Sequence, residues 1–273
     1  MNQVAILMTV YSKDSYNDFK EALDSLYLQS YKNFDIFIQE DGEIDPEIHK
    51  LLLKSLKKKK IKFLGERSKN KGFDYSLNEL ITLTMNLNYN YFFRMDSDDI
   101  SSTERVGKQL AFMENNPSID VCGTFIKEFG DGLKYSKTVS YPLKHSDMFL
   151  FFKKRVPLAH VTAVFRRSFF EKAGLYNVEG HINNGDTLMW MKGFKSGCKF
   201  ANLDIIGVKV RITKNFFKRR GGVHKIISDF KNRLVVNRSL KYGLSSYLYA
   251  LLVTGINILP LVLKKIAYQY LRR

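Results

Sequence analysis

The sequence predicts an α/β fold, a mostly parallel sheet flanked by helices, and three observations support this prediction. Over the first 125 residues, short apolar runs alternate with segments whose apolar residues recur at helical spacing. Polar clusters follow three of the apolar runs, at the point where strands of a parallel sheet meet their ligands. Positive charge is concentrated in the last third of the chain, which indicates a separate basic appendage.

The first half of the chain contains the clearest strand and helix patterns. Val4–Val10 is a continuous apolar run, typical of a strand buried on both faces. Ser15 is expected to cap a helix in which apolar residues recur from Phe19 to Tyr27. The further strands expected in this half cover residues 34–38, 61–64, 91–95 and 121–124, and the further helices cover residues 48–56, 77–87 and 106–115. Strands and helices in this order predict helices on both faces of the sheet.

Residues 126–210 are less regular. Gly130-Asp131-Gly132 predicts a hairpin turn, and the apolar run His160–Phe165 predicts a strand. Gly185 and Asp186 open a helical stretch, 187–195. We therefore expect a domain over residues 1–210, with halves of about 1–125 and 126–210, followed by a basic helical region over residues 211–273.

Composition excludes several classes of protein. With 45% hydrophobic and 14% aromatic residues, the 273-residue chain can bury a full core, which excludes a disordered protein. Its two cysteines are too few for a disulfide framework or a Cys-based zinc site and fit a reducing compartment. The first three residues carry no Lys or Arg, and the apolar run after them has only seven residues. We therefore expect no signal peptide.

The net charge of +17 is unevenly distributed. Residues 1–190 hold 26 basic and 25 acidic residues, whereas residues 191–273 hold 18 basic and 2 acidic residues. Such a basic segment favours an anionic partner, which leaves lipid headgroups, phosphate-bearing substrates and nucleic acid as alternatives.

Residues 244–263 form a run of twenty uncharged residues between Lys241 and Lys264. The length just meets the requirement for a membrane span, but Asn257 and Pro260 weaken that interpretation. Because basic residues flank both ends, we favour a helix or helical hairpin lying in the membrane interface. A spanning helix and a helix folded against the preceding domain are the alternatives.

The most acidic cluster is Asp96-Ser97-Asp98-Asp99, directly after an aromatic strand. Three carboxylates within four residues repel one another unless a cation offsets their charge. Carboxylate oxygens favour a hard cation, Mg²⁺ or Mn²⁺, which also binds diphosphate. The alternative is an acidic turn in which Asp99 caps the next helix.

Four stretches in this order resemble bacterial family 2 glycosyltransferases with the GT-A fold, of the exopolysaccharide and O-antigen type. They cover residues 4–11, 37–42, 70–78 and 94–100, and the last contains the DxD element of that family. The similarity extends over roughly residues 3–200. It implies a metal-dependent, inverting transfer of a hexose or N-acetylhexosamine from a UDP-sugar to a lipid-linked oligosaccharide of an O-antigen, capsule or exopolysaccharide repeat unit.

The resemblance implies roles at the nucleotide. Thr9, Tyr11 and Asp41 would hold the uracil and ribose, with Asp41 accepting a hydrogen bond from the base. Arg67 would also reach the nucleotide. The alternatives are packing at the strand end for Thr9 and Tyr11, and a turn residue for Asp41.

The resemblance also implies the metal ligands. Asp98 would bind Mn²⁺ or Mg²⁺, and Asp96 would contact ribose or metal. A divalent ion that bridges both phosphates stabilises the charge that grows on the departing diphosphate.

The acceptor hydroxyl needs a base, and the resemblance places it at the start of a helix, in a Glu-Asp pair. Asp186 matches the aspartate, whereas Gly185 replaces the usual glutamate. The alternative is that Asp186 only caps the helix. His160 matches a stretch on the acceptor side and would line the site, although a lone His is more often structural.

The basic segment contains a candidate phosphate-binding loop. Arg219 and Arg220 precede a Gly pair and would bind the phosphates of UDP or of a lipid-linked acceptor. A solvated basic loop is the alternative. The Gln-x-x-Arg-Trp element of processive family members is absent, so we expect addition of a single sugar.

Three functions remain as hypotheses from the sequence. The first is a UDP-sugar-dependent inverting transferase, peripheral on the cytoplasmic face of the bacterial inner membrane, with no nucleic-acid partner. The second is a nucleic-acid-binding protein that uses the basic C-terminal third, although no helix-turn-helix, RRM or zinc-finger pattern is visible. The third is a catalytically inactive paralogue that binds a sugar nucleotide.

Overall fold

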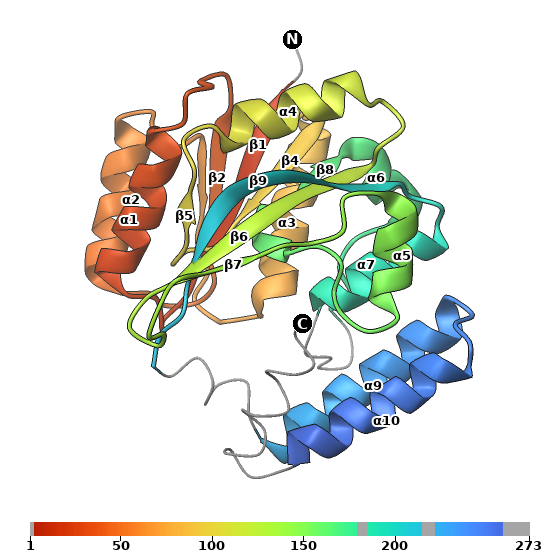
Figure 1. Ribbon diagram of the computed structural model, residues 1–273. Coiled ribbons are helices and arrows are strands. Elements are labelled where there is room, and N and C mark those ends of the chain that lie inside the picture. Colours follow the sequence, from red (N-terminus) through yellow and green to blue (C-terminus); the bar gives the residue numbers. More distant parts are fainter. Residues whose placement is uncertain (1–2, 179–184, 215–221, 259–273) are drawn as a thin grey trace.

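The structure is a computed structural model that describes residues 3–178, 185–214 and 222–258 (Figure 1). The strands are β1 (Val4–Val10), β2 (Asp35–Glu40), β3 (Phe63–Gly65), β4 (Tyr91–Met95), β5 (Ile100–Ser101), β6 (Val121–Phe129), β7 (Lys137–Val139), β8 (Val164–Arg166) and β9 (Phe200–Arg211). The helices are α1 (Tyr16–Tyr27), α2 (Pro46–Lys57), α3 (Phe73–Asn86), α4 (Arg105–Asn115), α5 (His145–Phe152), α6 (Arg167–Ala173), α7 (Gly185–Lys195), α9 (Val223–Ser239) and α10 (Leu244–Ile258).

In the part of the chain that the structure describes, the strands form one nine-stranded sheet in the order β3-β2-β1-β4-β8-β6-β9-β5, with β7 paired to β6. β1 pairs in parallel with both β2 and β4, and β2 pairs in parallel with β3. β8 runs antiparallel between β4 and β6. The predicted α/β sheet is therefore confirmed, and its first half is parallel throughout.

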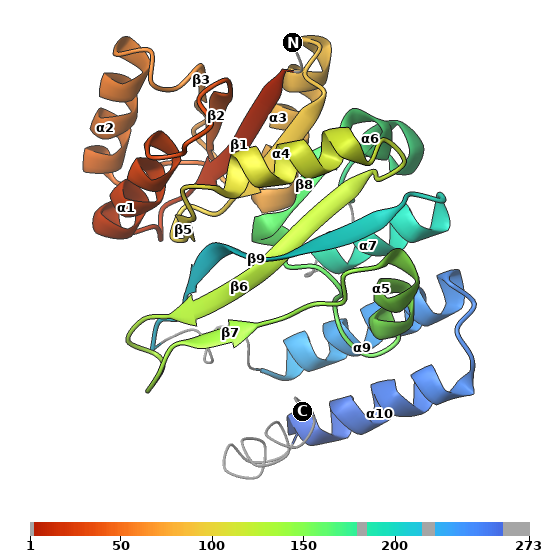
Figure 2. The ribbon, with the colours of Figure 1, turned by 45° about the horizontal axis from the view of Figure 1, so that its top comes forward.

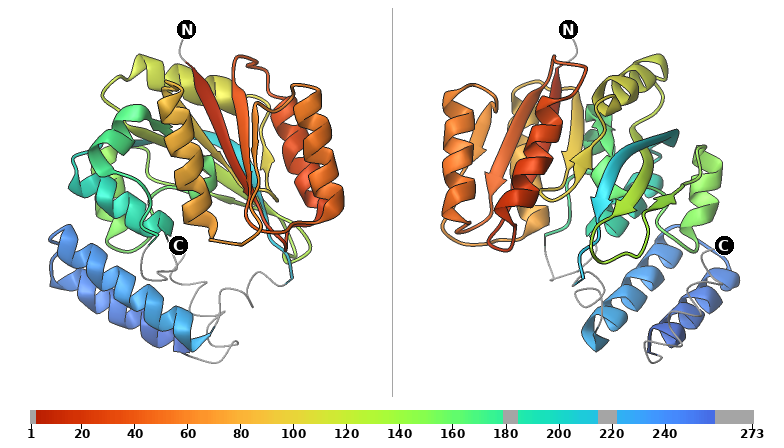
Figure 3. Two further views of the ribbon diagram at one scale, coloured as in Figure 1. Left: turned by 180° about the vertical axis from the view of Figure 1, so that it is seen from behind. Right: turned by 60° about the vertical axis from the view of Figure 1, so that its left-hand side comes forward.

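Helices cover both faces of the sheet (Figure 3). Ile6 and Met8 of β1 pack into a core shared with α1, α2 and α4. Ala5 and Leu7 point to the other face, where α3, α6 and α7 complete a second core. Because successive strand residues alternate between faces, burial on both sides explains why the β1 sequence is apolar at every position except Thr9.

Most boundaries in the first half agree with the sequence to within two or three residues. Ser15 caps α1 as predicted, because its hydroxyl accepts a hydrogen bond from the backbone N–H of Asp18 (3.4 Å). α3 begins four residues earlier than predicted, at Phe73, and its first turn includes Asp74 and the buried Ser76, which do not continue the apolar helical pattern. Asp99 does not cap a helix: β5 follows it, and α4 begins only at Arg105.

The predicted strand over residues 160–165 is wrong in its first half. Residues His160–Thr162 form a short 3-10 helix, η1, and β8 begins only at Val164. The Thr162 hydroxyl donates to the Ala159 carbonyl (2.8 Å) and accepts from the Thr124 backbone N–H (3.0 Å), which holds the turn. The predicted hairpin turn is confirmed, since β6 and β7 pair in antiparallel on either side of it.

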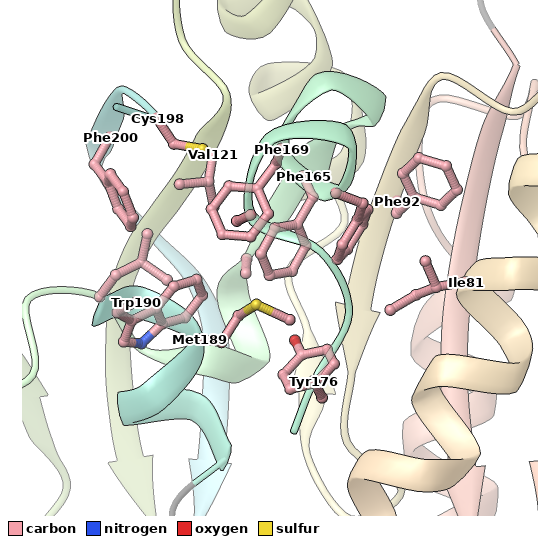
Figure 4. Packing of buried hydrophobic residues seen from close by; sticks show 14 of the residues in the cluster. Ile81, Phe92, Val121, Phe165, Phe169, Tyr176, Met189, Trp190, Cys198 and Phe200 are labelled. Atoms are coloured by element: carbon pink, nitrogen blue, oxygen red, sulfur yellow. The ribbon is translucent and has the colours of Figure 1, made fainter. Parts of the chain in front are cut away.

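An aromatic cluster fixes α7 against the sheet. The rings of Trp190 and Phe165 stack with centroids 5.6 Å apart, and those of Phe194 and Phe200 stack at 3.9 Å. Figure 4 shows Trp190 and Met189 of α7 packed among side chains of the sheet and α6. This packing determines where the first turn of α7, which contains Asp186, lies relative to the strands.

α9 and α10 lie side by side and pack below the sheet domain (Figure 2). Two hydrogen bonds join the pair to α5, from Arg233 Nη1 to the Phe152 carbonyl (2.6 Å) and from the Tyr242 hydroxyl to the Phe149 carbonyl (2.7 Å). No helix within residues 3–178, 185–214 or 222–258 is both long enough and apolar enough to span a bilayer.

Candidate active site

Three polar segments leave the sheet at one edge. β1 lies between β2 and β4, with Val10 opposite Glu40 and Met8 opposite Met95. All three strands are parallel, so the residues that follow them emerge on the same side. Thr9, Tyr11, Asp41 and Asp96 are therefore brought to one edge of the sheet.

Asp41 organises the loop that precedes α3. Its carboxylate accepts hydrogen bonds from the backbone N–H groups of Lys71 (2.8 Å) and Gly72 (2.9 Å), and its carbonyl accepts one from the Asn70 side chain (3.0 Å). Gly42 has a φ of 84°, and a Cβ there would lie 2.7 Å from the Asn70 nitrogen. Asp41 therefore anchors this loop in addition to any contact with a ligand.

Arg67 reaches the same turn. Its Nε lies 3.4 Å from Asp41 Oδ1, and its Nη2 donates to the Ser76 hydroxyl (2.5 Å) and lies 3.2 Å from Glu79 Oε2. Its buried Nη1 has no hydrogen-bond partner among the described residues. A hollow of about 540 Å³ lies beside this turn, with Gly42, Arg67 and Ser68 in its lining.

Two arginines hold the acidic loop after β4. Arg94, which is 2% exposed, forms an ion pair with Asp96. Arg211, at the end of β9, donates from its side chain to the Asp98 carbonyl (3.0 Å) and from its backbone to the Asp99 carboxylate (2.8 Å). Burial and the charges of Asp96 and Asp98 hold the pKa of Asp99 well above its usual range.

Asp14 adds a fourth carboxylate that the sequence did not indicate. It accepts a hydrogen bond from the Tyr11 backbone N–H (2.9 Å), which places it beside the acidic loop. Burial, together with the charges of Asp98 and Asp96, raises the pKa of Asp14 to about 7 against the hydrogen bonds that lower it. Four carboxylates therefore crowd around the DxD element, and those of Asp14 and Asp99 take up a proton more readily than an ordinary aspartate does.

The donor set at this loop fits a hard divalent cation, because carboxylate oxygens are its preferred ligands and the local negative charge favours a cation. Within the described residues, however, no group of three or more His, Cys, Asp or Glu side chains is arranged to hold a metal. Asp96 and Asp98 would therefore contribute only part of a coordination shell, and a diphosphate or water would supply the rest.

His160 sits between the acidic loop and α7. Its Nε2 is 2.6 Å from the Tyr176 hydroxyl, and its ring packs against Phe73 and Trp190. Burial and the charge of Arg94 hold the pKa of His160 well below its usual range, so the imidazole is neutral near pH 7. A neutral ring in an aromatic cage favours the structural role that the sequence left open.

Asp186 lies in the first turn of α7. Its Oδ1 accepts a hydrogen bond from the backbone N–H of Thr187 (2.7 Å). Burial holds the pKa of the Tyr176 phenol well above its usual range, and the charges of Asp74, Asp186 and Asp96 contribute in the same direction. The charges of these three carboxylates therefore all act on one phenol, which brings Asp186 into the neighbourhood of the DxD element.

Sequence reasoning missed four residues of this neighbourhood: Asp14, Asp74, Arg94 and Arg211. Arg94 and Asp74 had a local signal, since they stand in the 94–100 and 70–78 stretches that carry the family resemblance. Asp14 and Arg211 lie outside those stretches and meet the site only through the fold. Arg219 and Arg220 lie outside the described residues.

Comparison with known proteins agrees with this arrangement. Residues 5–174 match the family described as Glycosyl transferase family 2. The Escherichia coli UDP-Gal:alpha-D-GlcNAc-diphosphoundecaprenol beta-1,3-galactosyltransferase is 28% identical over 228 residues, which are 83% of this chain and 80% of that protein. The amylovoran biosynthesis glycosyltransferase AmsE of Erwinia amylovora is 25% identical over 266 residues, 97% of each chain.

Solved structures share the fold at lower identity. Staphylococcus aureus TarS has a TM-score of 0.63 at 15% identity, over 96% of this chain and 50% of the TarS chain, so this chain spans half of it. TarS 1–349 with UDP-GlcNAc has a TM-score of 0.59 at 17% identity (96% and 83% covered). The Pyrobaculum calidifontis mannosyltransferase PcManGT with GDP-Man and Mn²⁺ has 0.58 at 12% (97% and 78%). The expected GT-A fold is confirmed.

Proposed function

The chain belongs to glycosyl transferase family 2, and from that premise we propose that it moves one hexose or N-acetylhexosamine from a UDP-sugar to a lipid-linked oligosaccharide, with inversion. The observation that carries this proposal is that Asp96, Asp74 and Asp186, from three separate elements, all lie close enough to the Tyr176 phenol for their charges to raise its pKa. A transferase needs a cation site for the leaving diphosphate and a base for the incoming hydroxyl on one substrate, and the acidic loop after β4 and Asp186 of α7 would supply them.

The nucleotide would bind at the edge formed by β1, β2 and β4. Thr9, Tyr11 and Asp41 stand at the ends of two of these strands, and Arg67 lies beside Asp41. Each oxygen of the Asp41 carboxylate has more than one lone pair, so it can hold the 70–72 loop and still accept from the base. The complex of TarS 1–349 with UDP-GlcNAc supports a UDP-sugar as donor.

Asp98 and Asp96 would hold a divalent ion, Mn²⁺ or Mg²⁺, and the Mn²⁺ in the PcManGT complex supports this assignment. When bound, such an ion stabilises negative charge on the diphosphate. The chain itself contributes Arg94 and Arg211, which hold the loop in place through Asp96, the Asp98 carbonyl and Asp99. A loop fixed before the donor arrives loses little entropy on binding.

Asp186 would accept the proton of the acceptor hydroxyl. As the proton moves to the carboxylate, the hydroxyl oxygen forms its bond to the anomeric carbon and the bond to the diphosphate breaks, with its electron pair leaving on UDP. Attack from the face opposite the leaving group inverts the anomeric centre. The bond from the Thr187 backbone to Asp186 Oδ1 orients the base (2.7 Å).

The helix pair would place the enzyme at an anionic membrane surface. Four leucines of α10 are exposed and fall on one face at helical spacing: Leu244, Leu248, Leu251 and Leu252. The basic residues Lys231, Arg238 and Lys241 are exposed nearby. An apolar face flanked by positive charge fits an interface of anionic lipid. The E. coli relative, whose acceptor is a diphosphoundecaprenol, supports a lipid-linked acceptor.

The test is a thermal-shift and donor screen on the purified chain. UDP at about 100 times its dissociation constant, with Mn²⁺ present, should raise Tm by about 5–10 °C, from a stabilisation of about 2.7 kcal/mol. Asp98→Ala should lose the part of the shift that requires Mn²⁺. A matched control, Asp204→Asn, changes an exposed carboxylate on β9 and should keep the full shift.

Each other outcome has a clear meaning. A shift and donor hydrolysis with GDP- or dTDP-sugars, but not with UDP-sugars, would overturn the nucleotide while sparing the fold. Binding of UDP without any turnover on a lipid-linked acceptor would favour an inactive paralogue. Salt-dependent affinity for DNA or RNA without a response to UDP would favour the nucleic-acid alternative.

A further inference from the structure

The Asp74 carboxylate occupies the space that a side chain at residue 185 would need. Gly185 begins α7, and Asp74 lies in the first turn of α3. A Cβ on residue 185 would lie 2.0 Å from Asp74 Oδ2 and 2.4 Å from its Cγ, far inside van der Waals contact. The absence of a side chain at 185 is therefore what allows the Asp74 carboxylate to lie against the start of α7, next to Asp186.

The groups that face Asp74 come from several elements. Asp186 comes from α7 and Arg94 from β4, and the Arg94 guanidinium lies 4.4 Å from the centre of the Phe73 ring next to Asp74. Tyr176 lies in the segment after α6, and the charges of Asp74, Asp186 and Asp96 raise its pKa. Its hydroxyl is hydrogen-bonded to the neutral His160. Arg94 is the cation among these residues, and it already forms an ion pair with Asp96 rather than with Asp74.

We propose that Asp74 is a positioning residue for Asp186: its carboxylate, seated in the space left by Gly185, places a negative charge beside Asp186 and makes it a stronger base. This inference rests on the proposed function, in which Asp186 accepts the proton of the acceptor hydroxyl. A neighbouring negative charge favours the protonated form of a carboxylate, so it strengthens proton abstraction. Asp74 itself touches neither donor nor acceptor in this role.

The electrostatics agree with the geometry. Burial, together with the charge of Asp186, raises the pKa of Asp74 to about 6, and the charge of Arg94 opposes this rise. Above pH 6 Asp74 is therefore ionised and supports the base. As the pH falls through 6, Asp74 takes up a proton and its support of Asp186 is lost.

The first test is the pH profile of kcat with a saturating UDP-sugar. The wild-type protein should show an acid limb near pH 6. Asp74→Asn keeps the volume but removes the charge, so kcat at pH 7.5 should fall about tenfold and the limb near pH 6 should disappear. The two profiles should converge below pH 5, and KM for the UDP-sugar should stay unchanged.

The second test exchanges the two positions. Gly185→Ala should push the Asp74 carboxylate aside and lower kcat as Asp74→Asn does, although alanine is the better helix former. The double variant Asp74→Ala/Gly185→Glu returns a carboxylate to the same space from the other helix and should recover part of kcat. Its matched control, Asp74→Ala/Gly185→Ala, should not recover.

The controls distinguish a failure of the role proposed for Asp74 from a failure of the proposed function. Asp147→Asn removes an exposed carboxylate from the first turn of α5 and should leave the profile unchanged. An active wild-type protein whose pH limb persists in Asp74→Asn, or a double variant no better than its alanine control, would overturn the role of Asp74 alone. Absence of transfer by the wild-type protein would instead overturn the proposed function. If Asp74→Asn does not fold, the Gly185→Ala and exchange variants decide the question.

Discussion

The sheet domain and the C-terminal helix pair bury their apolar residues to very different extents. In β1 all seven residues are buried, whereas four leucines on one face of α10 are 53–75% exposed. The sheet domain completes its own core from both faces. The helix pair does not, and an apolar stripe of this kind is usually covered by a partner or a lipid surface. The difference fits the proposed function, in which the sheet domain would carry the chemistry and the helix pair would decide where it takes place.

The largest expected effect is on the chemistry of the sheet domain. Asp186→Asn should lower kcat by about 10³-fold, because an amide cannot accept the proton, and should leave the UDP-dependent rise in Tm intact. Asp204→Asn is the matched control on the sheet. If Asp186→Asn retains more than a tenth of wild-type kcat, the assignment of the base is wrong. Binding to vesicles should be the same for the wild type, Asp186→Asn and Asp204→Asn.

The next effect lies in the helix pair. Leu248→Glu/Leu252→Glu should weaken binding to vesicles rich in anionic lipid by about 100-fold, since each exposed leucine contributes about 1.5 kcal/mol on burial. Turnover on a short soluble acceptor should not change. Leu53→Glu/Leu56→Glu makes the same change on the exposed face of α2 and should bind vesicles as the wild type does. An equal loss of vesicle binding in both double variants would show that α10 has no special role in membrane binding.

A smaller effect tests how the nucleotide edge is held together. Asp41→Asn replaces one of two acceptor oxygens by an NH₂ group, so one of the N–H groups of Lys71 and Gly72 loses its partner. Stability should fall by about 2 kcal/mol, which lowers Tm by about 4–8 °C. UDP affinity should fall with it. A variant with unchanged Tm would show that the 70–72 loop is held by other contacts.

The smallest effect is on charge. Raising NaCl from about 0.1 M to about 0.5 M shortens the electrostatic screening length. Binding to anionic vesicles should therefore weaken by about tenfold. Turnover on a soluble acceptor should change less than twofold, because the groups of the active site are partly buried. Binding that does not respond to salt would assign the attachment to the leucines alone.

Sequence reasoning succeeded where a feature is local. The run Val4–Val10, the cap at Ser15 and the polar clusters at strand ends are each contained in a few consecutive residues, and all are present in the structure. The prediction of a strand over residues 160–165 failed because side-chain contacts, which the apolar pattern does not record, decide the local structure. Its apolar pattern suits a strand, but Thr162 bonds to Ala159 and Thr124, and these contacts favour a turn.

The sequence by itself determined the order of strands and helices, the edge at which polar residues gather, and the split between a neutral domain and a basic segment. These features follow from periodicities of two and 3.6 residues and from local composition. Tertiary structure alone decided that Asp74 lies against Gly185, that Arg211 holds Asp98 and Asp99, and that α10 keeps its leucines exposed. Each of these depends on how whole elements pack together, and no periodicity along the chain records that packing.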